Sequence, residues 1–178
     1  MRFDEVQLPA TSESKGRPKY IGDIFDELQA SGFRYVTMGC DVSDEDLPDD
    51  ELIENYREQI EKLMIEDNYE NIEVIELKNY SARTGSKVYK SNRDVFETRL
   101  ITHGQCSLFV NINDKLFELQ CNQGDVIRIP ASIPYWLEVG VHACRYIHLF
   151  MTEAGWDKPV ETRDKDFSQE LTHGRLAS

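Results

Sequence analysis

The sequence predicts a mainly β protein: an antiparallel barrel or sandwich with helices from the N-terminal part packed outside it (α+β). Two observations carry this prediction. Between residues 72 and 150, short apolar segments are separated by Gly, Pro and Asn, as in barrels and sandwiches. Before residue 70, two segments repeat apolar residues with the 3.6-residue period of a helix that faces a core. We expect these helices to cover one outer face of the barrel.

The first helix is expected from about residue 21, and Gly32 follows it where a C-terminal cap belongs. Its apolar residues share one helical face: Ile21, Ile24, Phe25 and Leu28. The segment Arg34–Met38 is compatible with a short strand. An acidic loop over residues 41–51 then leads into a second helix. The apolar residues of that helix again keep the helical period: Leu52, Ile53, Tyr56, Ile60, Leu63 and Met64.

The β-rich region begins after Asn68 and runs to Met151. The expected strands are 72–77, 96–102, 106–112, 115–121, 125–129, 135–139 and 144–150. Asn113-Asp114 joins two of them as a tight hairpin. The tail from Asp157 is polar. We therefore expect one domain over residues 1–178, with a helical part (1–70), a barrel (71–151) and a C-terminal tail (152–178).

Bulk composition restricts the partners. The 178 residues carry a net charge of −13, which argues against nucleic acid and anionic membranes as partners. No segment approaches the roughly 20 apolar residues of a membrane helix, and the first residues lack the apolar core of a secretory signal. The four cysteines form no C-x-x-C pair, and we expect them to be reduced, buried thiols. They are Cys40, Cys106, Cys121 and Cys144. We expect a cytoplasmic protein, a monomer or homodimer, acting on a small molecule.

Two segments, each beginning with a glycine, keep the spacing of the two cupin motifs. The first, usually G-x5-H-x-H-x3-E-x6-G, is matched at these positions: Gly85, Ser91, Arg93, Glu97 and Gly104. The second, usually G-x5-P-x-G-x2-H-x3-N, is matched at these: Gly124, Pro130, Ser132, Tyr135 and Val139. The chain thus resembles a cupin, which implies a double-stranded β-helix, also called a jelly-roll barrel. All three histidines of the motifs are replaced, and the carboxylate Glu97 is kept.

A longer stretch, roughly residues 20–156, resembles the acireductone dioxygenase family of methionine salvage. Glu97-Thr98-Arg99 is similar to its E-x-R, and the segment 121–131 (CNQGDVIRIPA) is similar to its C-x-x-G-D-[LV]-I-x-[VI]-P-A strand. Tyr135-Trp136 stands where the family has His-Trp. Leu149-Phe150 followed by Gly155-Trp156 is similar to its L-F…G-W ending.

This resemblance implies iron or nickel held by three histidines and a glutamate, at positions occupied here by Ser91, Arg93, Tyr135 and Glu97. A guanidinium has no lone pair to donate, and a serine hydroxyl or neutral phenol is a poor ligand for such metals. We therefore predict no metal ligands and no cofactor. A displaced iron or nickel site would need other histidines, and His148 alone is placed to point into the barrel.

The predicted site is a lumen with guanidinium groups, one carboxylate and one phenol. Strand alternation puts Glu97 and Arg99 on one face, and the resemblance makes that face the inner one. We predict Glu97 and Tyr135 as catalytic residues that move a proton or stabilise an oxyanion. The predicted substrate-binding residues are Arg93, Arg99, Ser91, Trp136 and His148, suited to a small carboxylate, enolate or phosphate.

Three functions stay open at this point. The leading hypothesis is a metal-independent enzyme on the acireductone dioxygenase scaffold that isomerises, dehydrates or cyclises a small polar, anionic molecule. The second is a non-catalytic binding or interaction module, in which Arg93 and Glu97 pair and plug the lumen. The third is dioxygenase chemistry with a displaced metal. A flavin or nucleotide enzyme is not favoured, because no glycine-rich phosphate motif is present.

Overall fold

The computed structural model describes residues 2–5, 21–39, 46–78, 87–91, 96–113, 115–131, 133, 135–139, 143–151 and 160–162. The helices are α1 (Ile21–Ala30), α2 (Asp49–Asn55) and α3 (Arg57–Asp67). The strands are β1 (Arg2–Glu5), β2 (Arg34–Thr37), β3 (Asn71–Leu77), β4 (Lys87–Ser91), β5 (Glu97–Ile112), β6 (Lys115–Asn122), β7 (Asp125–Ile129), β8 (Tyr135–Val139), β9 (Cys144–Phe150) and β10 (Val160–Thr162). Among the described residues, no helix is long and apolar enough to cross a membrane.

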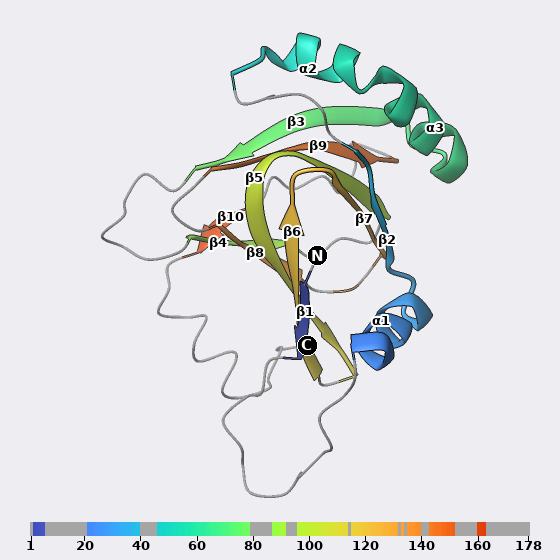
Figure 1. The fold of residues 1–178 in the computed structure, drawn as a ribbon, viewed down its shortest axis with the longest axis vertical. Helices are drawn as coiled ribbons and strands as arrows, with labels where there is room; N and C mark the ends of the chain where they lie inside the picture. Colours follow the sequence, from blue (N-terminus) through green and yellow to red (C-terminus); the bar gives the residue numbers. More distant parts are fainter. Residues whose placement is uncertain are drawn as a thin grey trace, which may run out of the picture.

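Strand β5 belongs to both sheets of the barrel. Its first part, from Glu97 to Gly104, pairs with β7 and β9, and these pair in turn with β2 and β3. Its second part, from Gln105 to Ile112, pairs with β6 and β8. Strand β6 pairs in turn with β1, β8 pairs with β4, and β4 pairs with β10. All these pairings are antiparallel. In Figure 1 the curved β5 ribbon passes from one sheet into the other.

Gly104 marks the point where β5 changes sheets. Its φ is +73°, and a Cβ atom there would lie 1.9 Å from the backbone oxygen of Ala143. The register with β9 also shifts between Ile101 and His103, as in a β-bulge. A positive φ, a bulge and close backbone contact together bend the strand, and only glycine fits this position. The sequence instead predicted two separate strands on either side of it.

Helices α2 and α3 cover the outer face of β3 and β9 (Figure 1). The second predicted helix is in fact these two, separated at Tyr56, whose φ is −105°. Leu52, Tyr56 and Ile60 are buried against Leu100, Val126, Ile147 and Leu149 of the barrel. Two ion pairs link this layer to the strands: Arg145 with Asp49 at 2.6 Å, and Arg128 with Asp67 at 3.0 Å.

Helix α1 lies apart from this pair, beside β1 and β2 (Figure 1), whereas we expected both helical segments on one face. Ile24, Leu28 and Phe33 join the cluster inside the barrel, and Glu27 pairs with Lys115 of β6 at 2.8 Å. The helix ends where predicted, because Gly32 has a φ of +93°. The N-terminal segment therefore contributes to the interior as well as to the outer covering.

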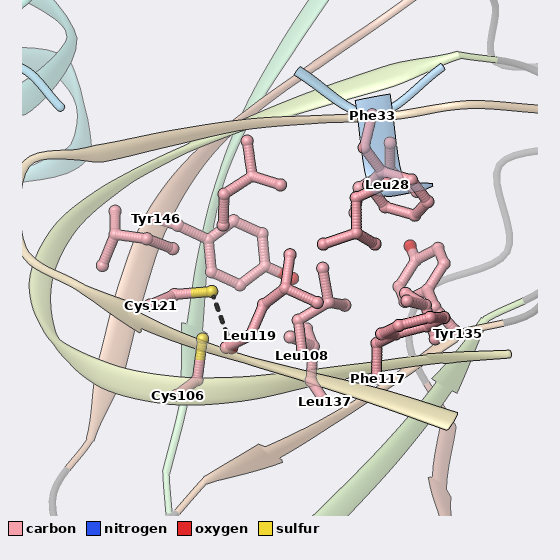
Figure 2. Packing of buried hydrophobic residues seen from close by; sticks show 14 of the residues in the cluster. Leu28, Phe33, Cys106, Leu108, Phe117, Leu119, Cys121, Tyr135, Leu137 and Tyr146 are labelled. Carbon is pink, nitrogen blue, oxygen red and sulfur yellow. Dashed lines mark hydrogen bonds between the residues drawn. The ribbon is translucent and has the colours of Figure 1, made fainter. Parts of the chain in front are cut away.

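The barrel interior is apolar over β6, β8 and the second part of β5 (Figure 2). Alternate residues face inward, among them Leu108, Phe117, Leu119 and Leu137. Cys106, Cys121 and Cys144 are free, buried thiols, and Cys40 lies outside the described residues. Hydrogen bonds from Cys121 and Cys144 lower the pKa of the Cys106 thiol. Three of the predicted thiols are therefore buried and unpaired by disulfides.

Candidate functional site

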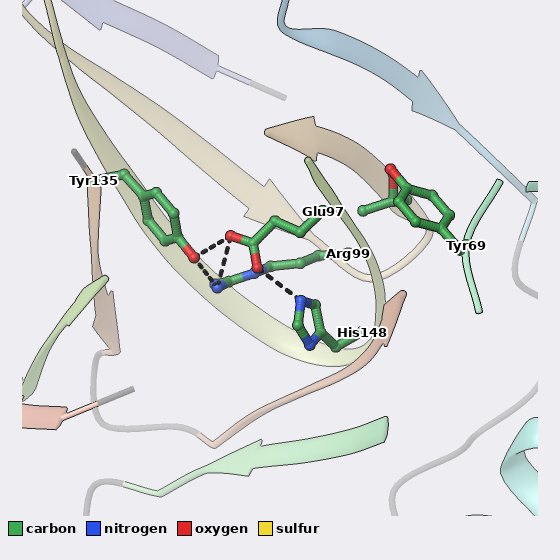
Figure 3. Close-up of polar contacts among 6 residues, drawn as sticks. Tyr69, Glu97, Arg99, Tyr135 and His148 are labelled. Atoms are coloured by element: carbon green, nitrogen blue, oxygen red, sulfur yellow. Dashed lines mark hydrogen bonds and ion pairs between the residues drawn. The ribbon is translucent and has the colours of Figure 1, made fainter. Parts of the chain in front are cut away.

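Four polar side chains from three strands meet inside the barrel (Figure 3). Glu97 and Arg99 come from β5, Tyr135 from β8 and His148 from β9. Glu97 and Arg99 face inward because they alternate with Thr98, whose side chain bonds the Tyr69 hydroxyl on the opposite side of the strand at 2.8 Å. Each of the four inner residues is at most 1% exposed.

The carboxylate of Glu97 is the centre of this group. Its Oε1 accepts a hydrogen bond from the Tyr135 hydroxyl and lies 3.4 Å from Nη2 of Arg99. Its Oε2 lies 2.7 Å from Nε2 of His148, whose ring stacks on Phe150 with centroids 4.7 Å apart. Nη2 of Arg99 also donates to the Tyr135 hydroxyl at 2.5 Å. Both carboxylate oxygens are therefore held by groups that can carry a proton.

The Arg99 guanidinium lies between two phenol rings. Its Cζ atom is 4.9 Å from the ring centroid of Tyr135 and 4.8 Å from that of Tyr146. Burial acts to lower the pKa of Arg99, but Tyr135, Tyr146 and Glu97 act against it, and the net pKa is raised. Burial raises the pKa of the Tyr146 phenol, and Glu97 adds to this while Arg99 opposes it. The interior thus holds a permanent cation and a protonated phenol.

Of the other predicted site residues, Trp136 is not part of this group. Trp136 alternates with Tyr135 along β8 and stacks on Phe109 on the other side of the sheet, with centroids 5.8 Å apart and planes 8° apart. Ser91 ends β4, and its backbone lies in register with Tyr135, but its side chain lies outside the described structure. Arg93 lies outside the described residues.

Tyr146 was missed by the sequence analysis. It lies on β9 two residues before His148, so alternation alone places both on the same face. That signal was available once His148 was expected to point inward. The sequence does not reveal that the Tyr146 ring lies over the Arg99 guanidinium.

Comparison with known proteins identifies the family. The ARD/ARD' family model matches residues 21–158. The chain belongs to the ARD/ARD' family. It is 29% identical over 136 residues to the acireductone dioxygenase of Alcanivorax borkumensis, covering 72% of this chain and 75% of that protein. With that of Aquifex aeolicus it shares 28% identity over 141 residues, 75% of this chain and 76% of that protein.

A solved ARD/ARD' relative supports the fold. The structure of acireductone dioxygenase from Bacillus anthracis with cadmium ion in its active center matches with a TM-score of 0.59 and 19% identity, over 82% of this chain and 92% of that chain. The predicted cupin barrel is therefore confirmed. The predicted membership of the acireductone dioxygenase family is confirmed as well.

The described side chains around Glu97 do not fit the iron or nickel that this family implies. Transition-metal sites need several lone-pair donors, and here the carboxylate faces a guanidinium that carries a permanent positive charge. Within the described part of the chain, no group of three or more His, Cys, Asp or Glu side chains could hold a metal ion. The described arrangement is a buried carboxylate in contact with a phenol, a guanidinium and an imidazole.

Proposed function

We propose that this ARD/ARD' member is a metal-independent enzyme that performs acid–base chemistry on a small polar, anionic molecule. Isomerisation, dehydration and cyclisation all belong to this class, because each can be driven by proton transfer to and from a general acid or base. The observation that carries the proposal is the Glu97 carboxylate, 1% exposed and held at both oxygens by Tyr135, Arg99 and His148.

Glu97 is the proton acceptor in this proposal. A general base must lie within hydrogen-bond reach of the groups that exchange protons with it, and Glu97 has such contacts at both carboxylate oxygens. Tyr135 donates to the same carboxylate, so a proton taken up by Glu97 can be returned through the phenol. The Nε2 atom of His148, 2.7 Å from Oε2, fixes the orientation of the carboxylate.

Arg99 supplies the positive charge for an anionic substrate. A guanidinium at the site of a developing enolate stabilises its negative charge without reorganisation, which makes this kind of electrostatic contribution large in catalysis. Because the whole chain has a net charge of −13, anions are bound here against the overall field of the protein. Arg93 and Ser91 remain predicted binding residues, whereas Trp136 packs on Phe109 on the other side of the sheet and is no longer expected to bind the substrate.

Deuterium exchange tests this proposal directly. The protein, purified without chelator, is incubated in D2O with a panel of small 2-oxo and 2-hydroxy acids, and loss of carbon-bound protons is followed by proton NMR. We expect exchange on at least one acid, and Glu97→Gln should abolish it while binding of that acid is largely kept. Tyr135→Phe, which keeps every charge, should slow it by about 10²–10⁴-fold.

Two controls make the result decisive. Tyr69→Phe removes a phenol hydroxyl on the other side of β5 and should leave exchange unchanged. Circular dichroism checks that each variant is folded. Exchange that continues at the parental rate in Glu97→Gln would contradict the role of the carboxylate.

The family relationship favours one second candidate, because the curated relatives are named acireductone dioxygenases. On this reading a metal sits elsewhere in the chain and oxygen chemistry is retained. Elemental analysis of the same preparation separates the two. Stoichiometric iron, nickel or manganese, together with loss of activity on chelation, would support a displaced metal. Binding of an anion without any exchange would instead support a non-catalytic module.

A further inference from the structure

Tyr146 and Arg99 present hydrogen-bond donors that nothing in the described structure accepts. The hydroxyl of Tyr146 and the Nε and Nη1 atoms of Arg99 are buried and have no hydrogen-bond partner within the described residues. The third guanidinium nitrogen, Nη2, is already engaged by Glu97 and Tyr135. Arg99 is 1% exposed and Tyr146 is 0% exposed, so bulk water does not reach them.

Such donors are rare in native proteins. A buried donor without an acceptor destabilises the fold, and most buried polar groups are therefore paired. The buried phenol of Tyr69 follows this rule, because its hydroxyl pairs with Thr98 at 2.8 Å. Tyr146 does not follow this rule, because its buried hydroxyl has no partner among the described residues. The centroid of its ring lies 4.8 Å from Cζ of Arg99. Three unused donors from two side chains in contact point to an acceptor-rich ligand.

The chemistry of the donors defines that ligand. Arg99 is permanently charged, and burial raises the pKa of Tyr146, so its phenol keeps its proton at neutral pH and can donate it to an acceptor. Three donor atoms match three acceptor oxygens. A carboxylate with an adjacent carbonyl or enol oxygen has this number, whereas a simple carboxylate has two.

We propose that Tyr146 is a substrate-binding residue that, together with Nε and Nη1 of Arg99, binds the oxygen atoms of a small 2-oxo acid or its enolate. This inference rests on the proposed function and specifies its substrate class. The guanidinium is then shared: Nη2 holds Glu97 and Tyr135, while the other nitrogens hold the substrate. The carbon next to the bound carbonyl is thereby placed near the carboxylate that would remove its proton.

Calorimetric titration tests the inference with pyruvate as the probe. The wild-type protein is compared with Tyr146→Phe, which removes only the hydroxyl, and with the matched control Tyr69→Phe. We expect Tyr146→Phe to raise the dissociation constant of pyruvate about tenfold, because a hydrogen bond to a charged ligand is lost. Tyr69→Phe should leave it unchanged. Acetate and pyruvamide should bind more weakly than pyruvate, since the first lacks an acceptor and the second the charge.

Thermal unfolding without ligand supplies the second readout. Removing an unpaired hydroxyl should raise the melting temperature of Tyr146→Phe by about 2–4 °C, whereas Tyr69→Phe should lower it by a similar amount. A merely structural hydroxyl would give the opposite sign for Tyr146→Phe. Equal pyruvate affinity in wild type and Tyr146→Phe, or no pyruvate binding by the wild type, overturns the inference.

The failure of this inference is distinguishable from that of the proposed function. Pyruvate binding that depends on Tyr146, combined with proton exchange that survives Glu97→Gln, would leave the binding site standing and remove the base. Proton exchange that requires Glu97 but is unchanged in Tyr146→Phe would support the base and remove Tyr146 from the substrate-binding site.

Discussion

At the scale of single residues, the pair Glu97 and Arg99 decides both chemistry and stability. The two are adjacent on the inner face of β5, at 3.4 Å, and each is 1% exposed. Breaking a buried ion pair leaves the remaining charge unpaired, which costs about 3–5 kcal/mol. Replacing both charges is far less costly, because no charge is left behind.

A double-mutant cycle therefore has a predictable outcome. Glu97→Gln and Arg99→Met should each lower the free energy of unfolding by about 3–5 kcal/mol, and the double variant should lose much less than their sum. Urea denaturation measures all four proteins. Additive losses would mean that the two charges are compensated separately by other groups in the lumen.

The raised pKa of Tyr146 predicts a loss of stability in alkali. A folded-state pKa above the unfolded value, about 10, means that the folded protein binds this proton more tightly. The contribution of this proton to the free energy of unfolding is complete below about pH 10. Above about pH 10 the free energy of unfolding falls by about 1.4 kcal/mol per pH unit. Urea denaturation between about pH 9 and 11.5 should show this slope, and Tyr146→Phe should reduce it. An unchanged slope in the variant would assign the loss to other groups whose pKa is raised in the folded protein, such as Tyr69, Cys121 and Cys144.

At the scale of elements, the conformation of Gly104 permits β5 to serve two sheets. An alanine there would adopt a positive φ and place its Cβ 1.9 Å from the Ala143 oxygen, which belongs to backbone and cannot simply rotate away. We expect Gly104→Ala to destabilise the fold by more than about 2 kcal/mol, the cost of the left-handed conformation alone being about 1–2. Gly39→Ala is the matched control, since a Cβ there meets nothing within 4 Å. Equal stability of the two variants in urea would exclude this account of the bend.

The sequence predicted the elements whose residues alternate or repeat within one strand or helix. Strands β7, β8 and β9 have the predicted bounds, because each is a short apolar run ended by a turn. Strands β1, β4 and β10 were not predicted. Each is short, and each is placed by its partner strand: β1 pairs with β6, β4 with β8, and β10 with β4. The division of the second helix at Tyr56 was not predicted either, because the helical spacing of apolar residues continues through Tyr56 without interruption.

The candidate site was predictable to the extent that it follows strand alternation. Glu97, Arg99 and His148 were expected to face inward, and they do. The contacts between them depend on the register of β5 with β9, where Arg99 lies opposite His148, and no local pattern reveals this register. The position of Tyr146 over the guanidinium depends on the same register.

At the scale of the whole molecule, net charge opposes the compact state. The chain has 33 acidic and 20 basic residues, hence a net charge of −13, and folding brings these like charges together. Salt screens this repulsion, since the Debye length shortens from about 30 Å at 0.01 M to about 8 Å at 0.15 M. Salt also weakens attractive surface pairs such as Arg57 with Glu54, but pairs this exposed to solvent contribute little to stability.

Repulsion between the excess carboxylates should therefore dominate the response to salt. We expect the midpoint of urea unfolding at pH 7 to rise when NaCl is increased from about 0.01 M to about 0.15 M. An equal concentration of sucrose gives no ionic screening and separates this effect from general exclusion of solutes. A midpoint that falls with NaCl would mean that attractive pairs outweigh the net charge. The buried Glu97–Arg99 pair, shielded from solvent ions, should contribute nothing to the difference.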